Sequence, residues 1–211
     1  VNALLEVPIS DRTVEPEAAA VTTNPTPTGE VERFPLQSER LTIRLADAVA
    51  DASLLRDWLD DEYGRHFLLT AATARPVNVQ ELLDNANNQI GIVQLTDAPI
   101  GAVAFLGIDT TQRRAELRKL IGKKSARGQG LAEEATHLWI QYGGACLGLE
   151  KIFVSTLQTH LRNIQLNENI GFKVEGVLRR EVLIDGERYD ILRMGLCFDE
   201  YIAAMREVET A

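Results

Sequence analysis

The sequence predicts a mixed α/β fold in which antiparallel and parallel strands share one sheet. Segments with a period of two residues alternate with segments of helical period along most of the chain. Three strand-like segments between residues 90 and 122 are joined by short turns, which favours antiparallel pairing. A helical segment then separates residues 114–122 from residues 151–157, and such a crossover favours parallel pairing.

Composition bounds the domain organisation and the class of partner. The 211 residues, 45% hydrophobic and 25% charged, suit one compact domain with an appendage. A net charge of −9 disfavours nucleic acid as a partner and suits a cationic or amine-bearing small substrate. No apolar run approaches the roughly 18 residues of a membrane span, so we expect a cytoplasmic protein with no membrane partner. Cys146 and Cys197 are too isolated for a disulfide framework or a zinc site.

Residues 1–35 are expected to form a flexible, acidic tail rich in proline and threonine. They contain five of the seven prolines and no aromatic residue before Phe34. Such a segment buries too little apolar surface to offset the entropy lost on ordering. We therefore place the domain at residues 36–211.

The first part of the domain combines a strand with two helices. Residues 41–45 alternate apolar and polar side chains, which is typical of a half-buried strand. Asp47 is expected to cap a following helix whose apolar positions run from Ala48 to Leu59. Residues 79–86 have the spacing of a second helix.

The later strands follow from their turns. Residues 90–95 and 100–108 are expected to pair across residues 96–99, before the strand 114–122. Asp185-Gly186 predicts a tight hairpin between residues 174–184 and residues 188–196.

A glycine-containing loop between residues 116 and 135 predicts an anion-binding site. Gly128 and Gly130 allow a tight turn, and a helix beginning at Leu131 would present free amides and the positive end of its dipole. Lys123, Lys124 and Arg127 add positive charge. The expected ligand is a phosphate or pyrophosphate.

Two common phosphate-binding loops are excluded by the residues after Gly130. A P-loop requires Gly-Lys followed by Ser or Thr, whereas Leu131 and Ala132 follow here. A dinucleotide fingerprint requires a third glycine, and that position is Glu133. The remaining pattern, a strand followed by R-G-x-G and a helix, resembles the pyrophosphate loop of the GNAT superfamily of acyl-CoA N-acyltransferases.

Further motifs carry the same resemblance from about Leu36 to Tyr201. S-E-R-L-T-I-R-L near the start and G-F-K-V-E-G-V-L-R near the end are similar to the subgroup of ribosomal-protein, polyamine, aminoglycoside and amino-sugar acetyltransferases. H-L-R-N-I-Q-L-N-E-N-I-G-F, residues 160–172, resembles the family's short helix before Gly-Phe. The resemblance implies a central, mostly antiparallel sheet of about seven strands with a V-shaped splay, flanked by about four helices. It also implies that residues 62–76, with Tyr63, His66 and Phe67, form the acceptor wall.

The resemblance further implies an acyl-CoA donor. Its pantetheine arm would pair with residues 120–122, and an amide of Leu120 or Ile121 would polarise the thioester carbonyl. Asn163 would contact the pantetheine or phosphate region, or would simply cap its helix. The expected CoA-binding residues are Leu120, Ile121, Gly122, Arg127, Gly128, Gln129, Gly130, Leu131, Ala132, Asn163 and Asn167.

Acid–base residues are less clearly marked. Glu116 is the first candidate base, although an ion pair with Arg118 would also explain it; Asp109 is a second candidate. His160 has a suitable ordinary pKa. Many relatives carry Tyr at the position of Asn167, and Asn cannot act as an acid. Either another group, Tyr189, Ser155 or a water, protonates the departing CoA thiolate, or the thiolate leaves without specific help.

Together, these expectations predict an N-acetyltransferase that moves an acetyl group from acetyl-CoA to a primary amine of a small molecule. The acceptor would be an amino sugar, an aminoglycoside-like compound or a polyamine, attacking directly in a ternary complex without a metal. A protein N-terminal acetyltransferase and a non-catalytic acyl-CoA-binding module are the alternatives. By analogy a homodimer is possible.

Overall fold

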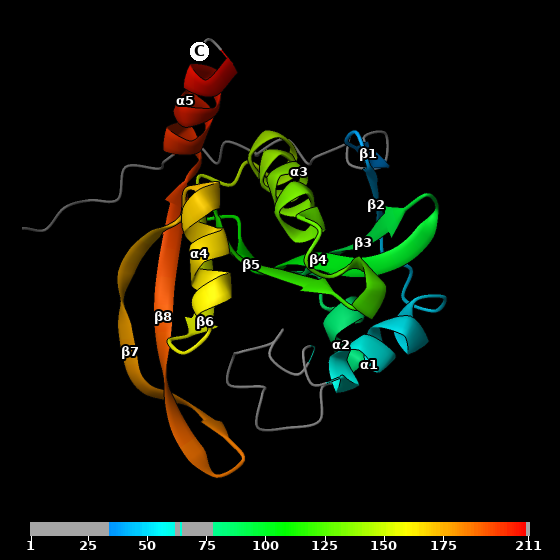
Figure 1. Ribbon diagram of the computed structural model, residues 1–211, viewed down its shortest axis with the longest axis horizontal. Coiled ribbons are helices and arrows are strands. Elements are labelled where there is room, and N and C mark those ends of the chain that lie inside the picture. Colours follow the sequence, from blue (N-terminus) through cyan, green and yellow to red (C-terminus); the bar gives the residue numbers. More distant parts are fainter. Residues whose placement is uncertain (1–33, 62–63, 65–77, 210–211) are drawn as a thin grey trace, which may run out of the picture.

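The computed structural model describes residues 34–61, 64 and 78–209 (Figure 1). The expected tail therefore lies outside the described residues up to position 33. The expected acceptor wall lies outside them too, apart from Gly64. Within the described part, one eight-stranded sheet has the strand order β1-β2-β3-β4-β5-β6-β8-β7. Every neighbouring pair is antiparallel except β5 and β6, so the predicted mixed, mostly antiparallel α/β sheet is confirmed.

The strands are β1 (Leu36–Gln37), β2 (Leu41–Leu45), β3 (Gln89–Leu95), β4 (Ala98–Asp109), β5 (Arg114–Ile121), β6 (Lys151–Leu157), β7 (Lys173–Ile184) and β8 (Glu187–Cys197). The helices are α1 (Ala52–Asp60), α2 (Val79–Asp84), α3 (Leu131–Leu147), α4 (Leu161–Ile170) and α5 (Phe198–Glu209), and Lys124–Ala126 form a 3₁₀ turn.

The described chain thus has one strand and one α-helix more than the sequence predicted. The extra strand, β1, is only two residues long and pairs with β2. The extra helix, α5, packs Phe198, Tyr201, Ile202 and Met205 against the core, a spacing of three, four and seven residues that is typical of an amphipathic helix.

The expected helix cap at Asp47 is wrong. Helix α1 begins only at Ala52, and the Asp47 carboxylate instead accepts hydrogen bonds from the amides of Val49 and Ala50 in the preceding turn. Asp51, the residue before the helix, is almost fully buried because its carboxylate binds the Arg44 guanidinium at 2.6 and 2.7 Å. An ion pair between strand and helix therefore fixes this junction.

The sheet divides at β5 and β6. The two strands pair only from Arg114 opposite Lys151 to Glu116 opposite Phe153. Beyond that point β5 continues beside β4, and β6 continues beside β8, so the two groups of strands diverge (Figure 1). We call β1–β5 the first arm and β6, β8 and β7 the second arm. The expected V-shaped splay is present.

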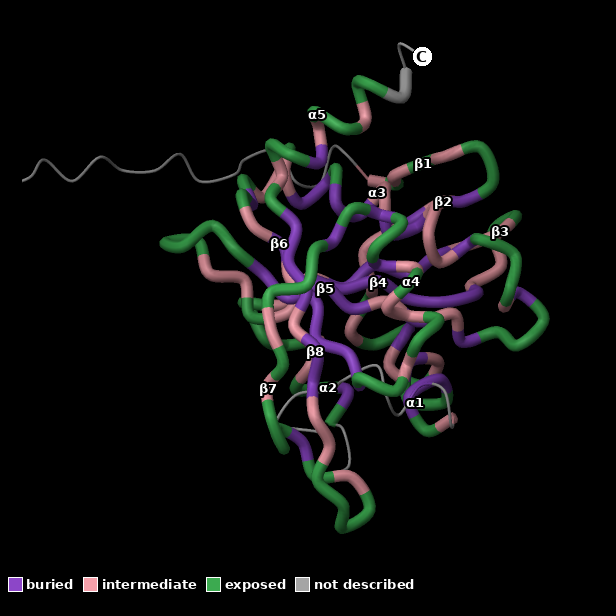
Figure 2. Tube along the Cα trace, turned by 60° about the vertical axis from the view of Figure 1, so that its left-hand side comes forward, coloured by how far each residue is buried: buried purple, intermediate pink, exposed green. Residues whose placement is uncertain are grey.

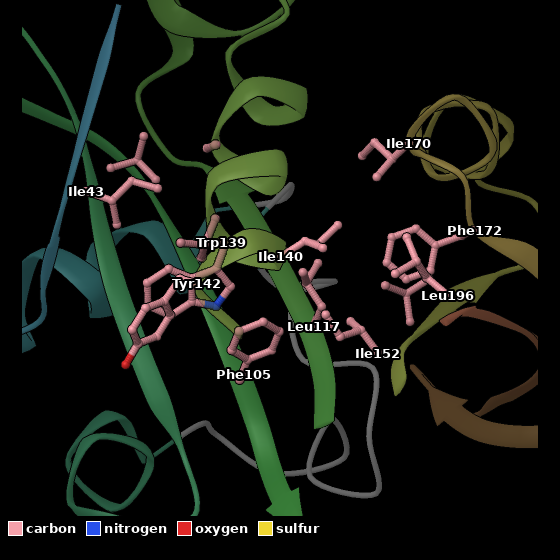
Figure 3. Close-up of a cluster of buried hydrophobic side chains, with 14 of the residues drawn as sticks. Ile43, Phe105, Leu117, Trp139, Ile140, Tyr142, Ile152, Ile170, Phe172 and Leu196 are labelled. Atoms are coloured by element: carbon pink, nitrogen blue, oxygen red, sulfur yellow. The ribbon is translucent and has the colours of Figure 1, made fainter. Parts of the chain in front are cut away.

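Helices cover both faces of the first arm. Helix α3 packs on one face, where Phe105 of β4 stacks on Trp139 with 5.5 Å between ring centroids (Figure 3). The other face packs against α1 and α2 through a separate cluster that includes Trp58 and Ile92. Helix α4 joins the first cluster through Ile170, so α3 and α4 share one side of the sheet.

Burial is concentrated in the central strands. Figure 2 shows long buried stretches in β4, β5, β6 and β8, whereas β7 is mostly exposed. The hairpin between β7 and β8 turns at Asp185 and Gly186, which both have positive φ, as the sequence predicted.

Candidate active site

The loop before α3 forms a cradle of free backbone amides. The amides of five consecutive residues, Gly128 to Ala132, donate no hydrogen bond within the described part of the chain. Gly128 and Gly130 both have φ of +77°, a conformation that glycine adopts without strain. A Cβ atom at Gly128 would meet nothing within 4 Å. The loop is exposed, and amides at a helix N-terminus attract anions.

Arg127 does not present its charge to this cradle, contrary to expectation. Its guanidinium donates to the carbonyl oxygens of Ile121 and Gly122, each at 2.9 Å, and to the Asp61 carboxylate at 2.7 Å. Its own amide donates to Lys124. The hydrogen bond from Arg127 holds the pKa of Asp61 below its usual range. Arg127 therefore ties the loop to the end of α1.

The cradle is bordered by a cation that sequence reasoning missed. Arg40 donates to the carbonyl oxygen of Gln129 at 3.2 Å and pairs with Glu134 in the first turn of α3. Burial alone would raise the pKa of Glu134, but hydrogen bonds from Ser38 and Arg40 outweigh it and hold the pKa low. Ser38 and Arg40 belong to the S-E-R-L motif, so the family resemblance was the available signal.

The edge of β5 beyond the splay is open over fewer residues than expected. Ile121 and Gly122 have carbonyl oxygens that already accept from Arg127. Gly122 is also closed on its side-chain face, because a Cβ there would lie 2.2 Å from the Trp58 ring. Since successive amides of a strand point to opposite edges, only one of Leu120 and Ile121 can direct its N–H into the splay.

Glu116 lies at the vertex of the splay and is buried in an ion pair. Its carboxylate accepts from the Arg118 guanidinium at 2.8 Å, and Arg118 also donates to the Ser155 carbonyl at 2.7 Å across the gap. Burial lowers the pKa of Arg118, and the Glu116 carboxylate opposes that shift. Within the described chain, the Nε atoms of Arg118 and Arg193 are buried without a hydrogen-bond partner. Two buried guanidinium N–H donors are therefore left without a partner among the described residues.

His160 and Asn163 lie at the start of α4. Burial lowers the pKa of His160, which keeps its imidazole neutral at pH 7. The Asn163 side chain does not cap the helix; its amide nitrogen donates to the Thr156 hydroxyl of β6 at 2.9 Å. Thr156 is fully buried, so this bond fixes α4 to the second arm.

Asn167 faces a lysine that was not predicted. The side chain of Lys119, on β5, donates a hydrogen bond to Asn167 Oδ1 across the splay. Asn167 is fully buried, and its backbone carbonyl receives the amide of Phe172 after the helix ends. The signal in the sequence was a lysine at the inward-facing position between Leu117 and Ile121.

The structure does not bring Tyr189 to this group. Its hydroxyl donates to Glu187 at 2.8 Å, and its ring packs with Leu157, Val182 and Ile191 near the end of the hairpin. Met194, which contacts Asn167, lies in β8 five residues after Tyr189. Residues five apart in a strand point to opposite faces of the sheet, so Tyr189 points away from Asn167. Tyr189 is therefore a poor candidate for the proton donor.

The described residues contain neither a cluster of metal-ligating side chains nor a helix that could cross a membrane. No group of three or more His, Cys, Asp or Glu among them could hold a metal ion, and the predicted absence of a metal stays a prediction. None of the described helices is long and apolar enough to cross a membrane.

The described structure thus combines a splayed sheet with free amides at a helix N-terminus, an arrangement that can bind an anion. The sequence matches the Acetyltransferase (GNAT) domain family over residues 40–173. This protein therefore belongs to the GNAT family and is an N-acetyltransferase.

Relatives support that assignment. The chain is 30% identical to an uncharacterized N-acetyltransferase, p20, of Bacillus licheniformis, over 79% of this chain and 97% of the relative. It is 27% identical to the spermidine N(1)-acetyltransferase of Escherichia coli K12, over 72% and 78% of the two chains. Among solved structures, the Vibrio cholerae spermidine N-acetyltransferase in complex with CoA and spermine is 22% identical with a TM-score of 0.67, covering 78% of this chain and 99% of that one. The structural likeness supports the fold.

Proposed function

We propose that this enzyme transfers the acetyl group of acetyl-CoA to a primary amine of a small molecule, with a polyamine as the preferred acceptor. The observation that carries the proposal is the run of free amides from Gly128 to Ala132 beside the unpaired edge of β5. A pyrophosphate needs several converging donors, and an amide-rich arm needs a strand edge.

The residues present fit this donor. The cradle would hold the pyrophosphate, with Gly128 and Gly130 leaving the space that a side chain would fill. The arm would lie along β5 as far as Leu120, since the Ile121 and Gly122 carbonyls are occupied. Bound in this way, acetyl-CoA supplies a thioester activated for acyl transfer. The single inward-facing amide of Leu120 or Ile121 would polarise its carbonyl.

The acceptor side supports an amine. Glu116 is on the face of β5 opposite Lys119, because strand side chains alternate. Its carboxylate would receive the amine proton, directly or through a water, while Arg118 holds it in place. The names of the Escherichia coli and Vibrio cholerae proteins, together with the net charge of −9, favour a polyamine over an amino sugar or aminoglycoside.

The expected homodimer stays a prediction. Edge strand β7 offers support, because Val174 and Val177 are 52% and 44% exposed beside its unpaired edge. Light scattering of the purified protein would measure the assembly.

Calorimetric titration with acetyl-CoA, comparing Gly128→Glu with Gly148→Glu, tests the donor half. Both glycines have positive φ and open space, and Gly148 lies at the other end of α3. In both variants a residue with a side chain takes a positive φ, which costs about 1–2 kcal/mol. Only Gly128→Glu also places a carboxylate in the cradle. We expect at least about 100-fold weaker binding for Gly128→Glu and unchanged binding for Gly148→Glu. Equal binding by both variants would place the donor elsewhere.

An acceptor panel tests the other half. Spermidine, glucosamine, an aminoglycoside and a peptide with a free N-terminus should be compared by release of free CoA thiol. We expect spermidine to give the highest kcat/KM. A higher value for the peptide would favour the N-terminal acetyltransferase, and acetyl-CoA binding without turnover of any amine would favour a non-catalytic module.

A further inference from the structure

Lys119 occupies an unusual position for a lysine. It lies between Leu117 and Ile121 on the face of β5 that packs toward α3 and α4, with its side chain partly buried. Its Nζ reaches across the splay to Asn167 Oδ1. No carboxylate forms an ion pair with it within the described chain. A strongly hydrated ammonium is rarely placed in such an environment without a function.

Asn167 holds this ammonium in place. Its side chain is 0% exposed, and its Nδ2 lies 3.8 Å from the sulfur of Met194 in the second arm. The oxygen is therefore the end of the amide that faces Lys119. Since an amide oxygen only accepts hydrogen bonds, it orients the lysine without removing its proton.

Charged neighbours and burial shape the acidity of Lys119. Burial, the largest cause, and the neighbouring Arg118 together lower the pKa of Lys119 to about 7, although Glu133 of α3 opposes the shift. Helix α4 contributes the neutral amide of Asn167. A lysine of ordinary pKa, about 10.4, would be a poor proton donor to a thiolate whose conjugate thiol has a pKa of about 8.5. An ammonium that titrates near neutral pH is a suitable one.

We propose that Lys119 is the general acid that protonates the departing CoA sulfur, and that Asn167 is the residue that positions it. This inference rests on the proposed acetyl-CoA-dependent function. Many relatives carry a tyrosine at the position of Asn167 on α4. Here we assign protonation of the sulfur to a lysine on β5 instead.

The step balances in protons and electrons. The acceptor nitrogen forms a bond to the carbonyl carbon, the carbon–sulfur bond breaks, and its electron pair stays on sulfur. Lys119 gives that sulfur a proton and becomes a neutral amine. Glu116, on the opposite face of β5, takes the proton released by the acceptor nitrogen. Solvent then returns a proton to Lys119 and removes one from Glu116.

Two variants separate acid catalysis by Lys119 from the effect of its positive charge alone. Lys119→Met removes the proton donor, and Lys119→Arg keeps the positive charge but cannot release a proton near neutral pH. For saturating acetyl-CoA and acceptor we expect kcat to fall about 100-fold in both variants, with acetyl-CoA affinity nearly unchanged in Lys119→Arg. If Lys119 instead binds a phosphate, Lys119→Arg would restore both affinity and kcat, and the inference would be wrong.

The pH profile gives a second readout. Because the charged form is the active one, kcat of the natural protein should fall as the pH rises through about 7. In Lys119→Met, kcat should not show this fall with rising pH. Asn167→Asp places a carboxylate beside the ammonium and should raise the pH at which kcat falls by about one unit. If kcat of Lys119→Met falls with rising pH as it does in the natural protein, the assignment is wrong.

A measurement without turnover completes the test. Trace labelling with acetic anhydride, read by peptide mass spectrometry on the protein without CoA, should give Lys119 half its maximal reactivity near pH 7. The exposed Lys123, labelled in the same sample, serves as the control for access of the reagent. A midpoint for Lys119 no lower than that of Lys123 would contradict the inference. Failure of the natural protein to bind acetyl-CoA in calorimetry would overturn the proposed function itself, whereas binding and turnover with an active Lys119→Met would overturn only this inference.

Discussion

The two arms of the sheet differ in how they are covered. In the first arm, β3, β4 and β5 are packed between α3 on one face and α1 and α2 on the other. In the second arm α4 and α5 cover one face, and the buried cluster on the other face contains, among the described residues, only Leu157, Val182 and Ile191. A sheet covered on both faces is a rigid support, and it carries the amide cradle.

The difference shows where the site obtains its geometry. Beyond the three paired residues at Glu116, the arms are joined across the splay by side chains: Arg118 reaches the Ser155 carbonyl, and Lys119 reaches Asn167. Backbone pairing would have closed the gap in which we propose that the donor arm lies. Polar side chains instead link β5 to β6 and to α4 while leaving a strand edge open to a ligand.

The largest effect is expected where the arms meet. Arg118→Met would leave the buried Glu116 carboxylate without its partner and remove the bond to Ser155. Loss of one member of a buried ion pair costs about 3–5 kcal/mol, which chemical denaturation would measure. Arg114→Met, on the same strand but in an exposed pair with Asp109, should cost no more than about 1 kcal/mol.

The double variant Glu116→Leu/Arg118→Met sharpens this test. Removing both charges should recover most of the lost stability, because neither is then buried alone. If Arg118→Met is as stable as the natural protein, the ion pair does not join the arms.

An intermediate effect is expected inside the first arm. A Cβ at Gly91 would lie 2.7 Å from Ile43 Cγ2 and 2.8 Å from the Trp139 ring, both fully buried. Gly91→Ala should therefore lower the free energy of unfolding by about 2–3 kcal/mol, as overpacking of a rigid core does. Gly176→Ala, in the open environment of β7, is the matched control and should change it by less than about 0.5 kcal/mol.

The smallest effect is expected in the second arm. Val182→Ala removes two carbon atoms from the small cluster with Leu157 and Ile191. Neighbours in so small a cluster can close over the gap, so the expected loss is about 1 kcal/mol in the same denaturation measurement. A loss as large as that of Gly91→Ala would show that the two arms are equally tightly packed.

The fold could be predicted from local patterns because most elements carry their own signals. Asp185-Gly186 marked the last hairpin, and Gly148 and Gly171 ended α3 and α4 with positive φ. The cap at Asp47 could not be placed, because the competing bond between Arg44 and Asp51 joins residues seven apart in different elements. Helix α5 follows β8 directly, with no turn residue between Cys197 and Phe198 to mark where it begins, although its apolar residues have helical spacing.

The site was predictable where the backbone makes it and not where side chains cross between elements. Gly128 and Gly130 identified the cradle because their conformation is a property of the local sequence. The inward turn of Arg127 toward Asp61, and the meeting of Lys119 with Asn167, depend on contacts between residues 66 and 48 positions apart. No local pattern encodes such distances.

A cradle made of amides has a consequence for how such sequences diverge. Every residue except proline supplies an N–H, so most substitutions at Gln129 or Ala132 would leave the donors in place. What natural selection must keep is the path of the chain: two glycines, the length of the loop and the first turn of α3. Side chains around the cradle can then change, and the proposed acceptor site with them, while the proposed binding of the donor by backbone amides is preserved.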